Sequence, residues 1–185
     1  MSSFSNTFSK IQRGIDRAQV SALNKASKKV KAALTKALMV ELGGVRQKVV
    51  ASRIRTIKAK ANRPVVTISV ATKYGLNLGE FGPRRNTVKT DAGKRRGVSV
   101  DPGSGRYTVP GAWLWQSKSG KKLVLGRKAA YSNGEYLGRG ARYKTTTLKT
   151  KPEYLRRQVE LLRPSMFRLA VIEMTRQLNG ELEGL

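Results

Sequence analysis

Two clusters of lysine and arginine are the best candidates in this sequence for ligand binding. One lies between Gly82 and Gly97, and the other lies around Gly120. Ammonium and guanidinium groups bind phosphate and carboxylate oxygens, and phosphate contacts give affinity without reading base sequence. Asp91 is the one acid between Gly82 and Gly97, and this segment has no apolar periodicity, so we expect it to face solvent or a negatively charged partner. The candidate DNA- or partner-binding residues are Arg84, Arg85, Lys89, Lys94, Arg95, Arg96, Lys118, Lys121 and Lys122.

Residues that could support catalysis or bind a metal are scarce. The sequence contains no histidine and no cysteine, which excludes imidazole-dependent triads, disulfides and His/Cys zinc sites. Asp91 and Asp101 are the only acids of the middle region near each other in sequence, and both lie in turn contexts, where Asp usually accepts backbone hydrogen bonds. We therefore expect a protein that is not an enzyme and that uses neither a cofactor nor a metal.

The charge of the chain indicates a negatively charged partner. Lysine and arginine number 38 against 11 acids, a formal net charge of +27. From residue 42 to residue 152 there are 25 bases and four acids, whereas the last 33 residues hold five of each. Nucleic acid, an anionic membrane and acidic proteins could each neutralise such a surplus. A polyanion would therefore meet the middle of the chain.

The apolar content predicts a folded, soluble protein. Hydrophobic residues make up 39% of the sequence, which is enough to form a core. A membrane-spanning helix needs about 20 apolar residues, and no such run is present. The first residues also lack the apolar run of a secretory signal, so we expect a protein made in the cytoplasm that does not enter a membrane.

The elements that position these clusters are predicted to include both helices and strands. Apolar residues from Leu23 to Leu38 recur at helical spacing, which predicts a helix over 6–42 that ends at Gly43-Gly44. A shorter basic helix is predicted over 45–60, with Val49, Val50, Ile54 and Ile57 inward. Another helix is predicted from Pro152 onward, with Ser165 as an N-cap after Pro164.

Strands are predicted between these helices. The β-branched run 65–70 reads as a strand that 76–81 continues, and 82–97 reads as a loop. Hairpins are predicted for 98–109 around a turn at 101–106, and for 112–125 around a turn at 116–121. The expected fold class is α+β. A long N-terminal helix and shorter helices pack on a small antiparallel sheet of at least three strands, with basic loops and a C-terminal helix.

We expect one domain over residues 1–185 with four parts. Residues 1–63 form its helical N-terminal part and residues 64–128 its antiparallel sheet. Residues 129–151 form a basic loop or arm, and residues 152–185 a C-terminal helical part.

Several motifs in this order resemble the minor tail protein Z family of lambda-like phages, also called tail completion proteins. They include Ala22-Leu-Asn-Lys-Ala26, Val45-Arg46-Gln-Lys48, a strand around Val66 followed by a basic loop, Gly97-Val-Ser-Val100, Val109-Pro-Gly-Ala-Trp113, a glycine turn at Gly120, Arg127, and Leu162-Arg-Pro-Ser165. The family pattern tends to have Phe where this chain has Trp113, which keeps the turn and changes its packing.

The resemblance implies a structural virion protein. Family members are similar to small α+β tail-completion and head–tail joining proteins that assemble as rings, and the resemblance implies a homo-oligomeric ring at the head-proximal end of the tail. The implied partners are further copies of the chain, tail terminator or tail tube proteins, head–neck connector proteins, and genome DNA bound without sequence preference. The implied location is the virion tail or neck, with assembly in the host cytoplasm. The alternative is a cellular, ribosome-associated nucleic-acid-binding protein.

Overall fold

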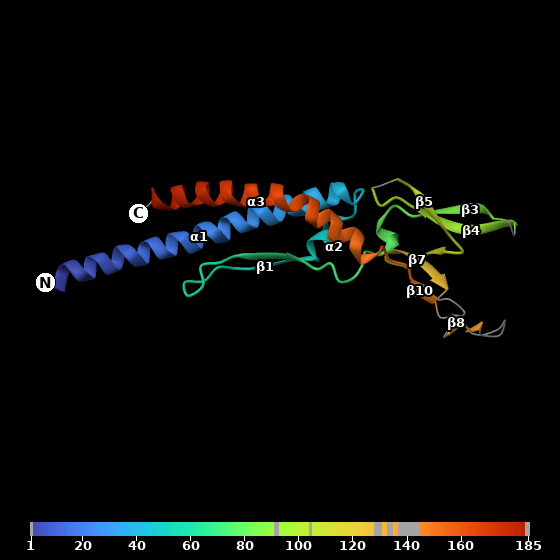
Figure 1. Ribbon diagram of the computed structural model, residues 1–185, viewed down its shortest axis with the longest axis horizontal. Coiled ribbons are helices and arrows are strands. Elements are labelled where there is room, and N and C mark those ends of the chain that lie inside the picture. The colour runs from blue at the N-terminus through green and yellow to red at the C-terminus, as the bar shows by residue number, and fades with distance from the viewer. Residues whose placement is uncertain are drawn as a thin grey trace. The chain divides into compact units, whose positions relative to one another are not determined.

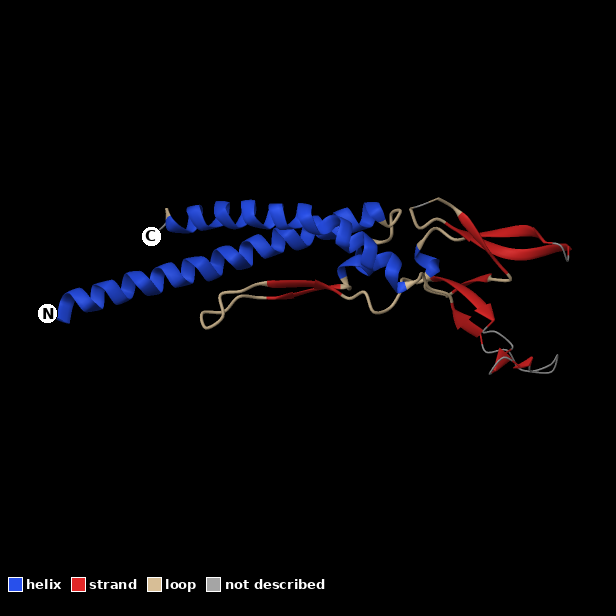
Figure 2. Cartoon of the chain, viewed as in Figure 1, coloured by secondary structure: helices blue, strands red, loops and turns tan. Residues whose placement is uncertain are grey.

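The computed structural model has an α+β fold, as the sequence predicted, with two long helices and small antiparallel sheets (Figures 1 and 2). It describes residues 2–90, 93–103, 105–127, 131–132, 135–136 and 145–183; for 2–9, 88–90, 93–96, 127, 131–132, 135–136 and 145–146 it describes the backbone alone. The chain forms two compact units. Unit 1 comprises Met1–Leu38, Gln47–Ala71 and Arg157–Leu185, and unit 2 comprises Met39–Arg46 and Thr72–Arg156.

The predicted N-terminal helix is present and is slightly longer than expected. Helix α1 spans Ser2–Glu41, and the apolar residues that it buries in unit 1 recur every four positions, at Ala18, Ala22, Ala26, Val30, Leu34 and Leu38. This spacing places them along one side of a helix, where they face the rest of the unit. The helix ends at Gly43 and Gly44, whose φ angles are 68° and 81° and whose amides donate to the carbonyls of Val40 and Met39.

The short basic helix predicted over residues 45–60 is wrong for most of its length. Helix α2 covers Gln47–Ala51 alone, and Ile54–Ile57 forms strand β1, which pairs antiparallel with β2 (Thr67–Val70). Val50 and Ile54 are buried as predicted, whereas Ile57 is exposed. Residues 54–57 fit a helix by spacing, but the β-branched strand that follows offers them a complete ladder partner.

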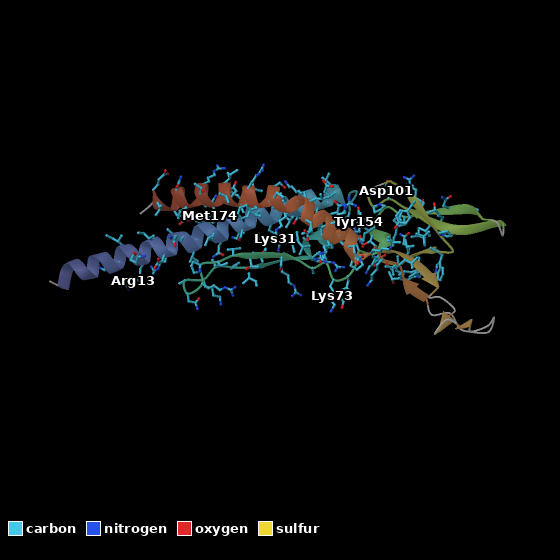
Figure 3. The ribbon with its side chains drawn as sticks, in the orientation of Figure 1. Arg13, Lys31, Lys73, Asp101, Tyr154 and Met174 are labelled. Carbon is cyan, nitrogen blue, oxygen red and sulfur yellow. The ribbon has the colours of Figure 1, made fainter. Side chains whose placement is uncertain are left out.

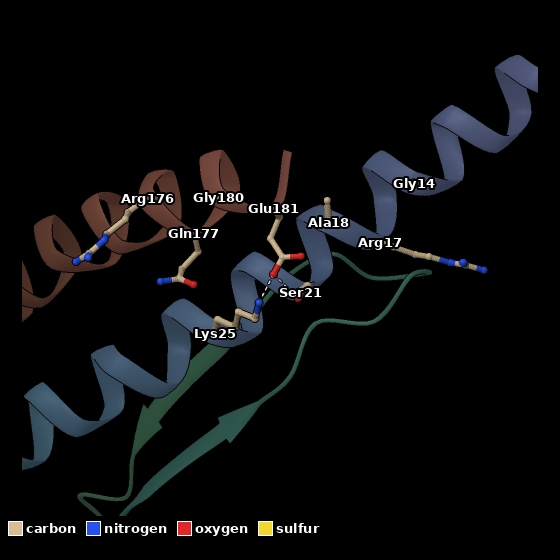
Figure 4. A pocket seen from close by; sticks show the side chains of 9 residues that line it. All are labelled: Gly14, Arg17, Ala18, Ser21, Lys25, Arg176, Gln177, Gly180 and Glu181. Atoms are coloured by element: carbon tan, nitrogen blue, oxygen red, sulfur yellow. Dashed lines mark hydrogen bonds and ion pairs between the residues drawn. The ribbon is translucent and has the colours of Figure 1, made fainter. Parts of the chain in front are cut away.

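Helix α3 (Pro152–Leu182) runs antiparallel beside α1 in unit 1, and ion pairs join the two helices (Figures 1 and 4). Glu173 accepts a hydrogen bond of 2.8 Å from Lys29, and Glu181 accepts one of 2.9 Å from Ser21 and pairs with Lys25. The partner lysines are the main reason why the pKa values of both glutamates are lowered from their ordinary range.

The helix predicted from Pro152 onward is confirmed, but the N-cap predicted at Ser165 is wrong, because α3 continues without a break through Pro164. Ser165 does not cap an N-terminus; its hydroxyl donates to the carbonyl of Leu162 at 2.9 Å. Proline inside a helix removes one backbone hydrogen bond. Beyond that point, the ion pairs of Glu173 with Lys29 and of Glu181 with Lys25 hold α3 beside α1.

The basic segment 82–97, predicted as a loop, is instead a β-hairpin in unit 2. Strands β3 (Arg84–Thr90) and β4 (Gly93–Val100) pair from Arg84↔Ser99 to Thr90↔Gly93, and β5 (Tyr107–Pro110) completes the sheet. Apolar alternation is missing because residues 84–87 are all exposed, so backbone hydrogen bonds rather than burial hold this part of the hairpin. The β4–β5 hairpin confirms the prediction for residues 98–109.

A second sheet of unit 2 confirms the hairpin predicted for residues 112–125. Strand β6 (Trp113–Gln116) pairs with β7 (Lys122–Arg127), and β10 (Thr145–Thr147) adds to the other edge of β7. The two-residue strands β8 (Tyr131–Ser132) and β9 (Glu135–Tyr136) pair with each other. The range 129–151 thus contains strands where a loop or arm was predicted, and its residues 129–130, 133–134 and 137–144 lie outside the described residues.

The strand predicted to continue over residues 76–81 is wrong. Leu78–Glu80 forms the 3-10 helix η1, and the side chain of Asn77 caps it by accepting a hydrogen bond of 2.8 Å from the amide of Gly79. Leu76, Leu78 and Phe81 are buried, so this segment contributes its apolar residues to the core of unit 2 as a turn. The prediction of at least three strands between residues 64 and 126 is confirmed by β2 to β7.

Candidate functional site

The hairpin β3–β4 sorts its basic residues onto two faces. Residues paired across an antiparallel ladder share a face, and successive residues alternate between faces. The register places Arg85, Lys89, Lys94 and Arg96 on one face, through the pairs Arg85↔Val98, Thr87↔Arg96 and Lys89↔Lys94. Arg84 and Arg95 fall on the other. We call the first of these the four-cation face.

The register of this hairpin pairs residues of like charge. Lys89 and Lys94 lie directly opposite in the register, and like charges in that position destabilise a strand pair. Arg84 and Arg85 are exposed, and no carboxylate among the described residues pairs with them. The side chains of Lys89, Lys94, Arg95 and Arg96 lie outside the described part of the structure.

The second predicted cluster lies in the turn between β6 and β7. The amide of Ser117 donates to the carbonyl of Lys121, and that of Gly120 donates to the carbonyl of Ser117, both at 2.9 Å. Gly120 has φ = 75°, a left-handed conformation that favours glycine. Lys118, Lys121 and Lys122 are exposed, and the described residues offer them no carboxylate partner.

Helix η1 contacts both the base of the hairpin and the start of β7, which follows the β6–β7 turn; we call this turn, with Lys118, Lys121 and Lys122, the lysine turn. The carbonyl of Phe81 accepts a hydrogen bond of 3.0 Å from the amide of Asp101, at the end of β4. At Gly79 a Cβ would lie 2.1 Å from the carbonyl oxygen of Lys122, so η1 and the start of β7 are in backbone contact. Lys122 therefore lies against η1, which leads into the hairpin base at Arg84, while Lys89 and Lys94 lie at the tip, about 14–17 Å along the strands from Arg84 and Arg85.

Two arginines outside the predicted binding clusters support this arrangement. Arg106 stabilises the base of the hairpin, because its guanidinium donates hydrogen bonds to the carbonyl of Gly82 at 3.3 Å and to Ser99 Oγ at 3.2 Å. Arg46 holds Glu80 through two hydrogen bonds of 2.7 and 2.8 Å. The hydrogen bond to Glu80, with its charge, raises the pKa of Arg46. This pairing neutralises the carboxylate of Glu80 in η1.

Tyr154 fixes the β4–β5 turn of unit 2. The side chain of Tyr154 is labelled in Figure 3. Its hydroxyl donates to the carbonyl of Pro102 and lies 3.5 Å from that of Glu41, in the last turn of α1. The backbones of Gly43 and Gly103 meet beside it, since a Cβ on Gly43 would lie 2.6 Å from the amide nitrogen of Gly103. Burial, followed by the charges of Glu41 and Asp101, raises the pKa of Tyr154.

Replacing Tyr154 with Phe is expected to change how stability depends on pH. The raised pKa means that the folded state holds this proton more tightly, so stability declines as pH rises above about 10, the value of an unfolded tyrosine. Tyr154→Phe should lower the free energy of unfolding by about 1 kcal/mol at pH 8 through the lost hydrogen bond. The stability of this variant should decline less steeply than that of wild type between pH 9 and 11. Urea unfolding at each pH measures both effects, with Tyr74→Phe at an exposed tyrosine as control. Parallel pH curves for Tyr154→Phe and wild type would contradict this role.

Unit 1 carries a third basic group, in the loop that joins β1 to β2. Lys58, Lys60 and Arg63 are exposed there. Asn24 of α1 holds the loop through two hydrogen bonds. The Asn24 side chain donates to the carbonyl of Ala59 at 3.2 Å and accepts from its amide at 3.0 Å. Asn24 belongs to the Ala22–Ala26 motif, but its spacing gave no signal of this contact because the partner lies 35 residues away.

An open polar pocket of about 690 Å³ lies between α1 and α3 (Figure 4). Three cations, Arg17, Lys25 and Arg176, line it with Glu181, whose carboxylate is engaged by Lys25 and Ser21. A single engaged carboxylate offers no acid–base pair. Within the described residues no group of three or more His, Cys, Asp or Glu side chains could hold a metal ion. Asp91 lies outside the described residues.

Fold and charge together define a basic α+β protein. The family described as Prophage minor tail protein Z (GPZ) matches residues 5–136, more than two thirds of the sequence. The chain therefore belongs to the prophage minor tail protein Z family. No curated protein and no solved structure matches it. The resemblance at Leu162–Ser165 lies beyond the matched residues.

Family membership makes the chain a structural protein of a phage tail. As such it is a virion component that interacts with other virion proteins. Among the helices that the structure describes, none is both long enough and apolar enough to cross a membrane.

Proposed function

We propose that this chain is a tail completion protein that forms a ring at the head-proximal end of the tail. The ring joins the tail to the neck of the head and surrounds the channel through which DNA passes. Its protein neighbours are the tail terminator or tail tube on one side and the neck connector on the other. Both units work together in this role as one tail-completion module, without catalysis, and the chain reaches the virion from the host cytoplasm.

The observation that carries the proposal is the unneutralised charge of unit 2. Arg84, Arg85 and the lysine turn are exposed and have no carboxylate partner among the described residues, and Glu80 of η1 is occupied by Arg46. A ring lumen that passes DNA needs such cations, because the duplex carries one negative charge per about 1.7 Å of its axis. Phosphate contacts of this kind hold DNA without selecting a sequence.

An acidic surface of a neighbouring ring is the second partner that this charge fits. Complementary charges would then guide docking of the two rings. The alternative of a ribosome-associated protein does not fit a chain that belongs to a phage tail family.

The composition and imaging of purified particles test the ring. We expect several copies of the chain per particle, with density at the neck, because a ring is built from repeated heterologous contacts. Quantitative mass spectrometry against the tail tube protein measures the copy number, and imaging of particles that carry a tagged chain locates it. A single copy per particle, a position elsewhere on the tail, or absence from the virion would refute the proposal.

A further inference from the structure

Unit 1 has an apolar groove that remains open. Helix α1, β2 with the residues before it, and α3 line the groove, which has a volume of about 780 Å³. Val30 and Leu34 lie on its α1 side and Ile68 on β2. On α3 its lining runs from Val159 to Met174, which spans about 22 Å of helix. Phe167 lines it with 70% of its surface exposed.

Helix α3 also exposes apolar residues on a second side. Leu161 and Ile172 are 62% and 63% exposed. At 100° per residue these two lie within about 20° of each other, whereas Phe167 and Met174 lie roughly 120–140° further round the helix. Large apolar side chains that gather on an exposed surface can mark a contact with another protein. Helix α3 therefore has an apolar side in the groove and two exposed apolar residues, Leu161 and Ile172, outside it.

The charge distribution identifies a second copy of the chain as the partner. Residues 157–185, the α3 part of unit 1, hold four bases and four acids, whereas the rest of unit 1 holds 14 bases and one acid. Copies would repel one another through those basic segments but not through α3. An acidic foreign protein would be drawn to the basic segments and away from the neutral helix.

We propose that α3 forms the contact between subunits, with the Leu161–Ile172 side of one copy packed into the groove of the next copy. Two different surfaces of the same chain meet in this contact, which is the heterologous kind that builds a ring. The inference rests on the proposed ring and specifies the surface that closes it. The net charge of +27 opposes this contact in dilute salt, so the free protein is expected to associate only when salt screens the charge.

Two charged variants test the contact in solution. Phe167→Asp places a charge at the groove, and Ile172→Asp places one on the opposite side; both positions are exposed, so both variants should fold, with circular dichroism as the control. Analytical ultracentrifugation should show wild-type oligomers that grow between about 0.1 and 1 M NaCl, where the Debye length falls from about 10 to 3 Å. Each variant should associate about 30-fold more weakly or worse, as expected for a central interface residue.

Mixing the two variants distinguishes this contact from a symmetric one. Phe167→Asp retains its Leu161–Ile172 side and Ile172→Asp retains its groove, so the mixture should form heterodimers that grow no further. The inference is overturned if Ile172→Asp assembles like wild type, if the mixture stays monomeric, or if wild type is monomeric at every salt concentration.

Cysteine cross-linking in particles separates this inference from the proposed function. The chain contains no cysteine, so Leu161→Cys with Met174→Cys introduces a single possible pair between neighbouring copies. Oxidised particles should give a ladder of oligomers for the double variant and none for either single variant. Several copies at the neck without a ladder would overturn the α3 contact and leave the ring intact. Absence of the chain from the particle would overturn the ring itself.

Discussion

Removing the four-cation face of the β3–β4 hairpin should flatten the salt dependence of DNA binding by roughly 3–4 units of log affinity against log salt. Each phosphate neutralised on duplex DNA contributes a slope of about −0.9, and Arg85, Lys89, Lys94 and Arg96 share one face of the ladder. Threonine is the suitable replacement, because these positions lie in strands and threonine favours them. Binding to two duplexes of unrelated sequence, titrated at several salt concentrations, measures the slope.

A matched variant controls for the loss of net charge. Replacing Lys10, Arg17, Lys28 and Lys36 with Gln removes four charges from exposed positions of α1 and keeps good helix formers there. This control should leave the slope close to that of wild type, and circular dichroism should show both variants folded. An unchanged slope for the hairpin variant would mean that the hairpin does not meet DNA. If tails then also failed to assemble, the hairpin's partner would be an acidic protein.

Gly79→Ala should destabilise unit 2 by about 1–3 kcal/mol or more and displace the lysine turn. A Cβ at this position would lie 2.1 Å from the carbonyl oxygen of Lys122 and 2.7 Å from its carbonyl carbon. Both are backbone atoms, so either η1 or β7 must move, and forced movement of a packed backbone costs about 1–3 kcal/mol or more. Urea unfolding measures the loss, and hydrogen exchange at β7 should show where the structure opens.

Gly180→Ala should have the opposite effect and stabilise the protein. This glycine lies inside α3, and a Cβ there would meet nothing within 4 Å. Alanine should stabilise the helix by about 1 kcal/mol, because glycine is the poorer helix former. Equal effects of the two substitutions, or a neutral Gly79→Ala, would refute the close packing of η1 on β7.

Local spacing determined the elements whose signals are contained within a few residues. The apolar residues of α1 recur along one side, and Gly43-Gly44 can adopt the left-handed conformation that ends a helix, so this helix follows from its own residues. The hairpins over 98–109 and 112–125 also combine alternating strands with turn residues. The basic clusters and the absence of histidine and cysteine follow from composition alone.

Pairing between distant segments decided the rest. Residues 54–57 fit a helix by spacing and became a strand because Thr67–Val70 completes their ladder. The hairpin at 84–100 lacks apolar alternation because residues 84–87 are exposed, so only its hydrogen-bonded register reveals it. That register divides the basic residues between two faces, and the contact of Gly79 with Lys122 places the start of β7 against η1. Which cations lie together depends on pairing between segments that are far apart in the sequence, and a local pattern of residues does not reveal that pairing.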